Sequence, residues 1–214
     1  FIVDSGSTDQ TLALCKEYTA NILPHSWPHS RAQRNWALDS LPIKTNWVMN
    51  LDADHRITPE LAAEISRIFE KEIDPAINGF LASRRTIFLN KWIRRGGHYP
   101  TYHAILFRIG KGHCEEKLYD QHFKVEGKIE LLKGDIIDII ADSIGSFIAR
   151  HNTWAELEAQ YQLAETTDGK VIEGRLFGNP IERRRYLKKK YERFPLFVRP
   201  AIYFFIRYFL KLGL

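Results

Sequence analysis

Cysteine is scarce in this chain of 214 residues. The two cysteines, Cys15 and Cys114, lie far apart and lack the close spacing of metal-ligand pairs. No secretory signal pattern stands at the start of the sequence. These absences give neither thiol a role, and they favour a reduced, cytoplasmic setting.

Long apolar runs are also missing. Residues 194–214 are crowded with aromatics, but Arg199, Pro200, Arg207 and Lys211 interrupt them. A helix that spans a membrane needs about 20 mostly apolar residues. This segment is therefore too broken to cross a membrane.

The remaining composition is ordinary for a soluble globular protein. Hydrophobic residues make up 44% and charged residues 27% of the chain, which argues against disorder. A chain of this length can bury one good core and also carry an appendage. We therefore expect one catalytic domain.

The net charge of +5 is unevenly distributed. Residues 181–214 contain ten lysines and arginines against only Glu182 and Glu192, a local balance of +8, so the other 180 residues carry −3. This pattern predicts that the C-terminus meets an anionic surface. It argues against a nucleic-acid groove across the whole protein.

The first half of the chain has the pattern of alternating strands and helices. A strand at residues 1–3 precedes a helix through about Tyr18, for which Ser7 and Gln10 have the spacing of a capping box. Because the chain begins inside this strand, we expect a further strand upstream in the intact protein. Later elements are expected at residues 22–23 (strand), 31–41 (helix), 46–51 (strand) and after Pro59 (helix). This order predicts a parallel sheet with crossover helices.

The second half is richer in strands and is expected to be mixed or antiparallel. The predicted elements are strands at 80–89 and 104–109, a hairpin over 123–132 about Glu126-Gly127, a long amphipathic helix at 143–165, a linker at 166–180, and a basic, aromatic helical segment at 181–214. The apolar stripe of the long helix is most simply core packing.

The chemistry is expected where an apolar run ends in two carboxylates. Residues 48–51 suit a buried strand, and Asp52 and Asp54 follow at its carboxyl end. Residues two apart on an extended segment point to the same side, so both carboxylates can face one ligand. Two hard oxygen donors suit Mg²⁺ or Mn²⁺ carrying phosphates. A solvated acidic turn is the plain alternative.

Two other polar clusters have both a structural and a functional interpretation. Asp4 ends the first strand, and Gly6 permits a tight turn toward a ligand, but this run is equally good turn chemistry. Residues 119–123 (YDQHF) form the second cluster. A lone His or Asp there is more often a hydrogen-bonded structural residue, and only its position in the fold can decide.

Three motifs in order resemble those of one enzyme family. They are the strand end at 3–11 (VDSGSTDQT), the segment at 34–38 (RNWAL) and the strand end at 46–54 (NWVMNLDAD). Together they resemble the family 2 glycosyltransferases over about residues 1–140. The resemblance implies the Rossmann-like α/β GT-A fold, with a mixed sheet flanked by helices, in a domain at 1–165. Residues 119–123 (YDQHF), 136–138 (IID) and 150–154 (RHNTW), with the basic aromatic tail, resemble a bacterial subgroup that builds exopolysaccharide or lipopolysaccharide.

The resemblance also implies site residues and ligands. The donor would be a nucleotide-diphosphate sugar, and the cofactor Mg²⁺ or Mn²⁺. Asp4 would lie near the base or ribose in a donor site with Ser7, Asp9 and Arg34, Asp52 near the ribose and diphosphate, and Asp54 on the metal. His55 stands where the family often has an acid, and we interpret it as a neutral replacement at the rim.

Inverting transfer also requires a base that takes the proton of the acceptor hydroxyl. In the resemblance this base lies after the metal motif. Asp120 is the first candidate, His122 the second, and Glu115 or Glu116 stand behind them. The acceptor would be a lipid-linked or polysaccharide hydroxyl.

The C-terminal segment, residues 181–214, predicts an interfacial helix on an anionic membrane at the cytoplasmic face. A helix pair packed on the catalytic domain is the alternative. Two other functions stay open: a membrane-recruited sugar-nucleotide binding module without turnover, and a nucleotidyltransferase. The latter usually has a Gly-rich, basic loop near the N-terminus, which this sequence does not show.

Overall fold

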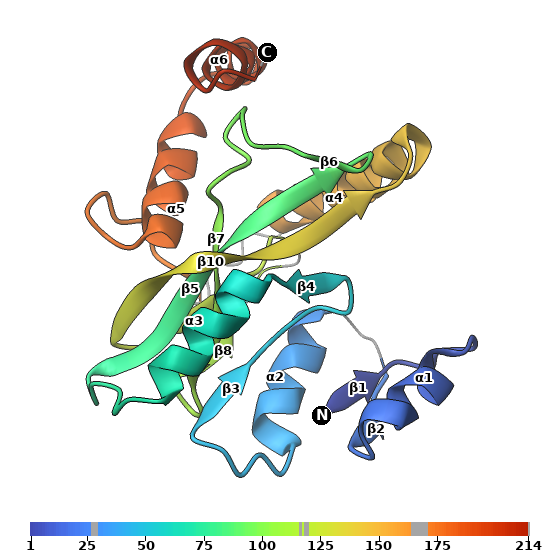
Figure 1. Cartoon of the computed structure of the whole chain (residues 1–214). Helices are drawn as coiled ribbons and strands as arrows, with labels where there is room; N and C mark the ends of the chain where they lie inside the picture. Colours follow the sequence, from blue (N-terminus) through green and yellow to red (C-terminus); the bar gives the residue numbers. More distant parts are fainter. Residues whose placement is uncertain (27–29, 116, 118–119, 164–170, 214) are drawn as a thin grey trace.

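A mixed sheet of six strands is the centre of the computed structural model, which describes residues 1–26, 30–115, 117, 120–163 and 171–213 (Figure 1). The strands, in spatial order, are β3 (Trp47–Met49), β7 (Tyr102–Arg108), β5 (Ile77–Phe88), β10 (Lys128–Ala141) and β4 (His55–Ile57), with β6 (Lys91–Trp92) beside β5. Strands β5 and β10 are parallel, and the other pairs are antiparallel. The expected mixed α/β architecture is present.

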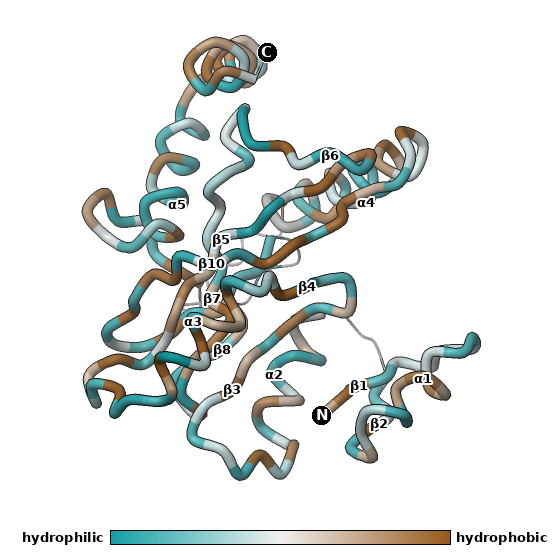
Figure 2. The backbone as a smooth tube through the Cα atoms, viewed as in Figure 1, coloured by the Kyte–Doolittle hydropathy of each residue, from teal (hydrophilic) through white to brown (hydrophobic). Residues whose placement is uncertain are grey.

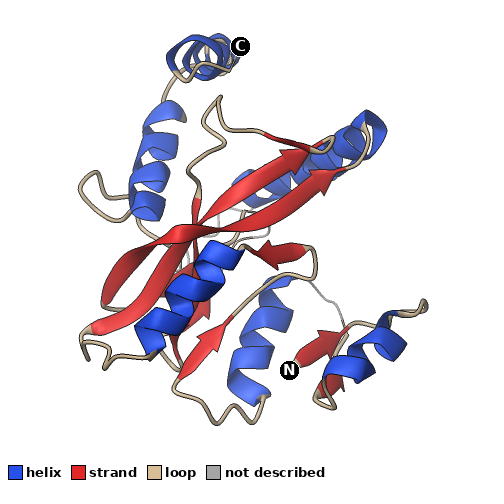
Figure 3. Cartoon of the chain, in the orientation of Figure 1, coloured by secondary structure: helices blue, strands red, loops and turns tan. Residues whose placement is uncertain are grey.

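Helix α3 (Pro59–Phe69) packs along β10 over the main core (Figure 3). Leu61 of this helix is fully buried in a cluster with Phe80 and Ile136. Thr58 caps the helix, because its hydroxyl accepts a hydrogen bond from the Leu61 amide at 3.2 Å. The helix start predicted at Pro59 is confirmed.

A small parallel sheet precedes the main sheet. Strand β1 (Ile2–Asp4) pairs with β2 (Ile22–Pro24), and helix α1 (Thr11–Tyr18) connects them. The predicted crossover between these two strands is confirmed. The prediction that the strand at residues 46–51 continues the same parallel sheet is wrong, since β3 pairs antiparallel with β7 in the main sheet. Within the described residues no strand joins the two sheets. Periodicity indicates a strand's buried face but not its partner.

The predicted capping box of Ser7 and Gln10 is also wrong. Gln10 is the N-cap of α1, but its side chain makes no capping hydrogen bond. Ser7 instead donates its hydroxyl and its amide to the Asp4 carboxylate, at 2.5 and 3.1 Å. Hydrogen bonds to an ionised carboxylate are stronger than neutral ones, so Asp4 holds Ser7 away from the helix.

The predicted hairpin over residues 123–132 has the right turn and the wrong pairing. Gly127 has a φ of +90°, which favours glycine at the turn. However, β9 (Phe123–Val125) pairs with β8 (Gly112–Cys114), and β10 runs parallel to β5. The long apolar β10 finds a partner of matching length in β5, which local turn chemistry does not reveal.

The remaining helices are α2 (Ser30–Ser40), α4 (Ile144–Leu163), α5 (Pro180–Tyr191), α6 (Arg199–Phe205) and the π-helical turn η1 (Ile206–Leu210). The predicted long helix is confirmed as far as Leu163, and residues 164–170, where the linker was expected to begin, lie outside the described residues. Helices α5 and α6 lead away from the sheet toward the C-terminus (Figure 1).

Apolar residues fill much of the sheet and return at the C-terminal end (Figure 2). There many of them are exposed, for example Phe205 at 53% and Phe209 at 49%. Among the described helices, none is both long enough and apolar enough to cross a membrane. Residues 181–214 contain α5, α6 and η1, and their role as a membrane-associating segment stays a prediction.

Candidate active site

The loop between β3 and β4 gathers three potential metal ligands. Asp52, Asp54 and His55 each offer one ligand atom, and these atoms lie within 4.8 Å of one another. The two carboxylate oxygens suit a divalent cation such as Mg²⁺ or Mn²⁺, and the imidazole nitrogen is a third possible ligand. His55 has no ligand role among the residues predicted from the sequence. Its position directly after Asp54 is the sequence feature that could have indicated a third ligand.

Arg34 reaches this loop from helix α2. Its Nη2 donates to Asp52 Oδ1 at 2.5 Å. The next residue fixes the helix, because the Asn35 side chain accepts from the Cys114 amide at 2.9 Å and donates to the Cys114 carbonyl at 3.1 Å. The structure therefore joins two predicted donor-site residues, Arg34 and Asp52, and Asn35 explains their position.

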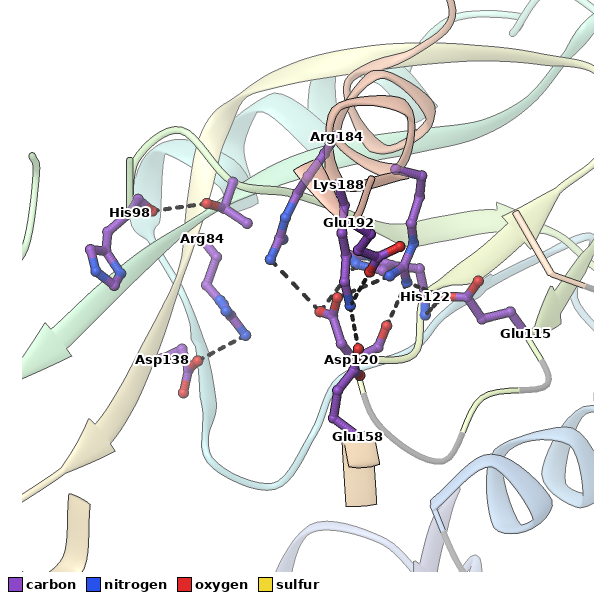
Figure 4. A network of polar contacts seen from close by, with 12 residues as sticks. Arg84, His98, Glu115, Asp120, His122, Asp138, Glu158, Arg184, Lys188 and Glu192 are labelled. Carbon is purple, nitrogen blue, oxygen red and sulfur yellow. Dashed lines mark hydrogen bonds and ion pairs between the residues drawn. The ribbon is translucent and has the colours of Figure 1, made fainter. Parts of the chain in front are cut away.

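Asp120 lies in a second cluster, a dense network of polar contacts (Figure 4). Arg185 Nη1 donates to Asp120 Oδ2 at 3.0 Å, and His122 Nε2 lies 3.6 Å from Asp120 Oδ1. Burial favours a raised pKa for the Asp120 carboxyl, but the hydrogen bond from His122 and the charge of Arg184 outweigh burial and hold the pKa far below its usual range. The group is therefore ionised at neutral pH.

His122, in the same polar network, stacks against another histidine, His103. The rings of His103 and His122 lie 4.7 Å apart. Burial lowers the pKa of both imidazoles, so both are neutral at pH 7. His122 Nδ1 is buried, and no described group makes a hydrogen bond to it. It is a second candidate to accept a proton.

Glu115, a reserve candidate for the base, has a structural environment. Its side chain is fully buried, and its Oε1 accepts from Arg185 at 2.5 Å and from the His122 amide at 2.9 Å. Arg185 also donates to the Asp120 carbonyl at 2.6 Å. Glu115 thus fixes the position of Arg185, which in turn pairs with Asp120. Glu116 and Tyr119 lie outside the described residues.

One cavity of about 460 Å³ joins the two clusters. Asp52, Asp54 and His55 line it together with Asp120 and His122. It is also lined by the ion pair of Arg84 with Asp138 (3.1 Å apart), by Arg150 and His151 of α4, by Arg184 of α5 and by Arg207 of η1. The three potential metal ligands Asp52, Asp54 and His55, which we call the metal-ligand trio, and a potential base therefore line one cavity.

The first strand end does not reach this cavity in the described structure. Asp4, Ser7 and Asp9 are not among its lining residues. Bonds from Ser7 and Gly6 occupy the Asp4 carboxylate and lower its pKa, and Asp9 accepts from the Thr11 amide at 2.9 Å. These contacts form turns. A role for the three residues in donor binding stays a prediction.

The sequence is similar to a known protein family and to several of its members. Residues 1–123 match the profile described as Glycosyl transferase family 2. An uncharacterized glycosyltransferase of Rickettsia prowazekii is 35% identical over 174 residues, which cover 74% of this chain and 57% of that protein. Another, of Rickettsia typhi, is 26% identical over 170 residues with the same coverage. The chain thus spans little more than half the length of these relatives.

The profile extends over more than half of the chain and includes every predicted site residue from Asp4 to His122. The mixed sheet flanked by helices is consistent with the GT-A fold that this family adopts. The three motifs, the shared cavity and the relatives agree, and this chain belongs to glycosyl transferase family 2.

Proposed function

We propose that this chain forms the catalytic part of an inverting, metal-dependent glycosyltransferase. It would move a sugar from a nucleotide-diphosphate donor to a hydroxyl of a lipid-linked or polysaccharide acceptor, of the kind that builds exopolysaccharide or lipopolysaccharide. The proposal rests on one observation: Asp52, Asp54 and His55 line the same cavity as Asp120 and His122.

The loop after β3 would bind the donor. Asp54 and His55 would hold the cation with Asp52, which Arg34 fixes through its 2.5 Å contact. A bound divalent cation neutralises the charge that develops on the leaving diphosphate. Arg84, which pairs with Asp138 at 3.1 Å, and Arg150 also line this cavity and add positive charge to its wall.

Asp120 would act as the base. As the acceptor oxygen forms its bond to the anomeric carbon, the bond from that carbon to the diphosphate oxygen breaks, and the acceptor proton passes to the Asp120 carboxylate. Arg185 and His122 keep this carboxylate ionised and oriented. His122, neutral at pH 7, is the second candidate for the same step.

Donor binding can be tested by thermal unfolding with a panel of nucleotide-diphosphate sugars. With Mn²⁺ and a matching donor at about 100 times its Kd, we expect stabilisation of about 2.7 kcal/mol, or roughly 5 to 10 °C. EDTA should remove the effect. Transfer is then measured as release of nucleoside diphosphate in the presence of acceptor. Stabilisation without turnover would support a binding module, and the absence of any metal-dependent stabilisation would contradict the proposal.

We also propose that the C-terminal segment holds the protein on an anionic membrane at the cytoplasmic face without crossing it. Its support is the exposed apolar surface of Phe205, Phe209 and Leu210 (53%, 49% and 66% exposed) in a segment that also exposes basic residues, among them Arg193 and Lys211. Apolar burial at the headgroup boundary and attraction to anionic lipid, about 1 kcal/mol for each basic residue near the surface, would act together.

Co-sedimentation with liposomes tests this membrane proposal. Binding should require anionic lipid, fall as salt rises, and decrease strongly in the double variant Phe205→Ser/Phe209→Ser. Phe177→Ser is the matched control, because Phe177 is 98% exposed but lies outside the segment. If the double variant sediments as well as the control, the segment does not mediate binding, and packing on the catalytic domain becomes the better interpretation.

A further inference from the structure

A second cavity lies beside the catalytic one and has a different character. Its volume is about 690 Å³, and it is enclosed by the loop after β6 and by α6 with η1. Trp92, Tyr203, Phe204 and Tyr208 give it aromatic walls, and Arg94 is held over the Trp92 ring at 4.1 Å. We call this cavity the aromatic groove. Such walls suit an apolar ligand that also carries an anionic group.

The C-terminal turn is fixed against the loop that forms the other wall. The Gly96 amide donates to the Lys211 carbonyl at 2.8 Å, and Arg207 Nη1 donates to the Gly96 carbonyl. Arg207 Nε also donates to the Tyr203 hydroxyl at 2.8 Å. In the π-helical turn the Lys211 amide bonds to the Ile206 carbonyl at 2.9 Å. The groove is therefore built by specific contacts.

Two cations converge on Gly97, which lines the catalytic cavity, and one of them, Arg207, also lines the groove. A Cβ atom placed on Gly97, which has a φ of +75°, would lie 2.9 Å from both Arg207 Nη1 and Lys211 Nζ. In the described part of the chain no carboxylate pairs with either group. Burial and the charge of Arg207 lower the pKa of Lys211. Like charges brought together this way are stabilised by an anion between them.

We propose that the aromatic groove binds the phosphate-bearing lipid part of the acceptor. The phosphate lies between Arg207 and Lys211 at Gly97, and the hydrocarbon chain lies along Trp92, Phe204 and Tyr208. This inference rests on the proposed transferase function and names its acceptor class as a lipid phosphate. The donor diphosphate has a separate site, because the metal-ligand trio lines the other cavity.

Arg207 connects the groove to the chemistry. It lines both cavities, so a phosphate bound to it lies at their boundary. An acceptor anchored there extends its sugar toward Asp120, which lines the catalytic cavity from the same side as Arg184. The exposed side chains of Phe205 and Phe209 belong to the same helical turn but do not line the groove. The proposed membrane-binding surface and one wall of the groove therefore belong to the same helical segment.

Equilibrium binding of farnesyl phosphate, a short soluble lipid phosphate, tests the proposal by calorimetry. The intact chain should bind farnesyl phosphate at least ten-fold more tightly than farnesol or inorganic phosphate. Lys211→Gln and Phe204→Ala should each weaken binding about ten-fold or more, and Lys211→Arg should retain it. Lys190→Gln and Phe205→Ala are matched controls from residues 181–214, since neither residue lines the groove or lies against Gly97, and both should bind as the original chain does.

Each contrary result identifies what is wrong. Equal binding of inorganic phosphate would overturn the lipid part, and equal binding of farnesol would overturn the phosphate part. Wild-type affinity in both Lys211→Gln and Phe204→Ala would overturn the site. Metal-dependent donor stabilisation measured on the same preparation separates the two proposals: donor binding without lipid binding contradicts the groove alone, and lipid binding without donor binding contradicts the transferase function alone.

Discussion

Replacing Asp54 with asparagine is expected to abolish metal-dependent sugar transfer while the chain keeps its fold. Asp54 is exposed, and no described residue makes a hydrogen bond or ion pair with it, so the change removes no structural contact. It does remove one negative charge from the metal-ligand trio, and carboxylates are the ligands on which Mg²⁺ and Mn²⁺ chiefly depend. Turnover with each metal and the unfolding temperature provide the two measurements.

Two further substitutions make this result specific. Asp39→Asn changes an exposed aspartate at the end of α2, outside the cavity, and should leave turnover unchanged. Asp52→Asn should weaken donor binding in addition to turnover, because Asp52 also fixes Arg34. Wild-type turnover of Asp54→Asn with either metal would show that the loop after β3 is a solvated acidic turn.

Asp120→Asn is expected to lower the transfer rate by a factor on the order of 10² to 10⁴ and to leave nucleotide binding nearly unchanged. Asparagine keeps the shape of the side chain but cannot take a proton. Glu115 still pairs with Arg185 in this variant, so the surrounding network keeps its main ionic contact. The measurement is kcat under saturating donor, compared with the donor Kd from thermal stabilisation.

His122→Ala is the internal comparison for this prediction. Because the pKa of Asp120 is held low, its carboxylate stays ionised as the pH falls to 6, and the rate should not decline through its protonation. If His122 is the base instead, His122→Ala should lose at least as much rate as Asp120→Asn. Equal losses of donor affinity and rate in Asp120→Asn would indicate a structural role.

Local sequence chemistry predicted the parts of the site that lie within one strand end or helix start. Asp52 and Asp54 follow an apolar strand, and Thr58 with Pro59 begins the next helix, because these signals act over a few residues. The pairing of β10 with β5 could not be predicted this way. A strand's alternation specifies its faces, and its partner depends on the whole sheet.

Long-range ionic contacts were equally hidden in the sequence. Arg185 lies in a run of basic residues that we interpreted as part of a membrane-binding segment, yet it is only 10% exposed and pairs with Glu115 and Asp120. Nothing in the local pattern separates it from Arg183 or Lys189, which are exposed. Only the fold brings residue 185 to residue 120.

This contact also bears on where the working unit of the chain ends. The family profile stops at Phe123, but Ile181 of α5 belongs to a buried core cluster and Arg185 neutralises a carboxylate that is fully buried. Removing one partner of a buried ion pair destabilises a protein by about 3–5 kcal/mol. A version of the protein trimmed at the profile boundary, or before α5, would therefore lose the ion pair that holds Asp120, the base proposed above. Helix α5 therefore belongs to the same folded unit as the region that the family profile covers.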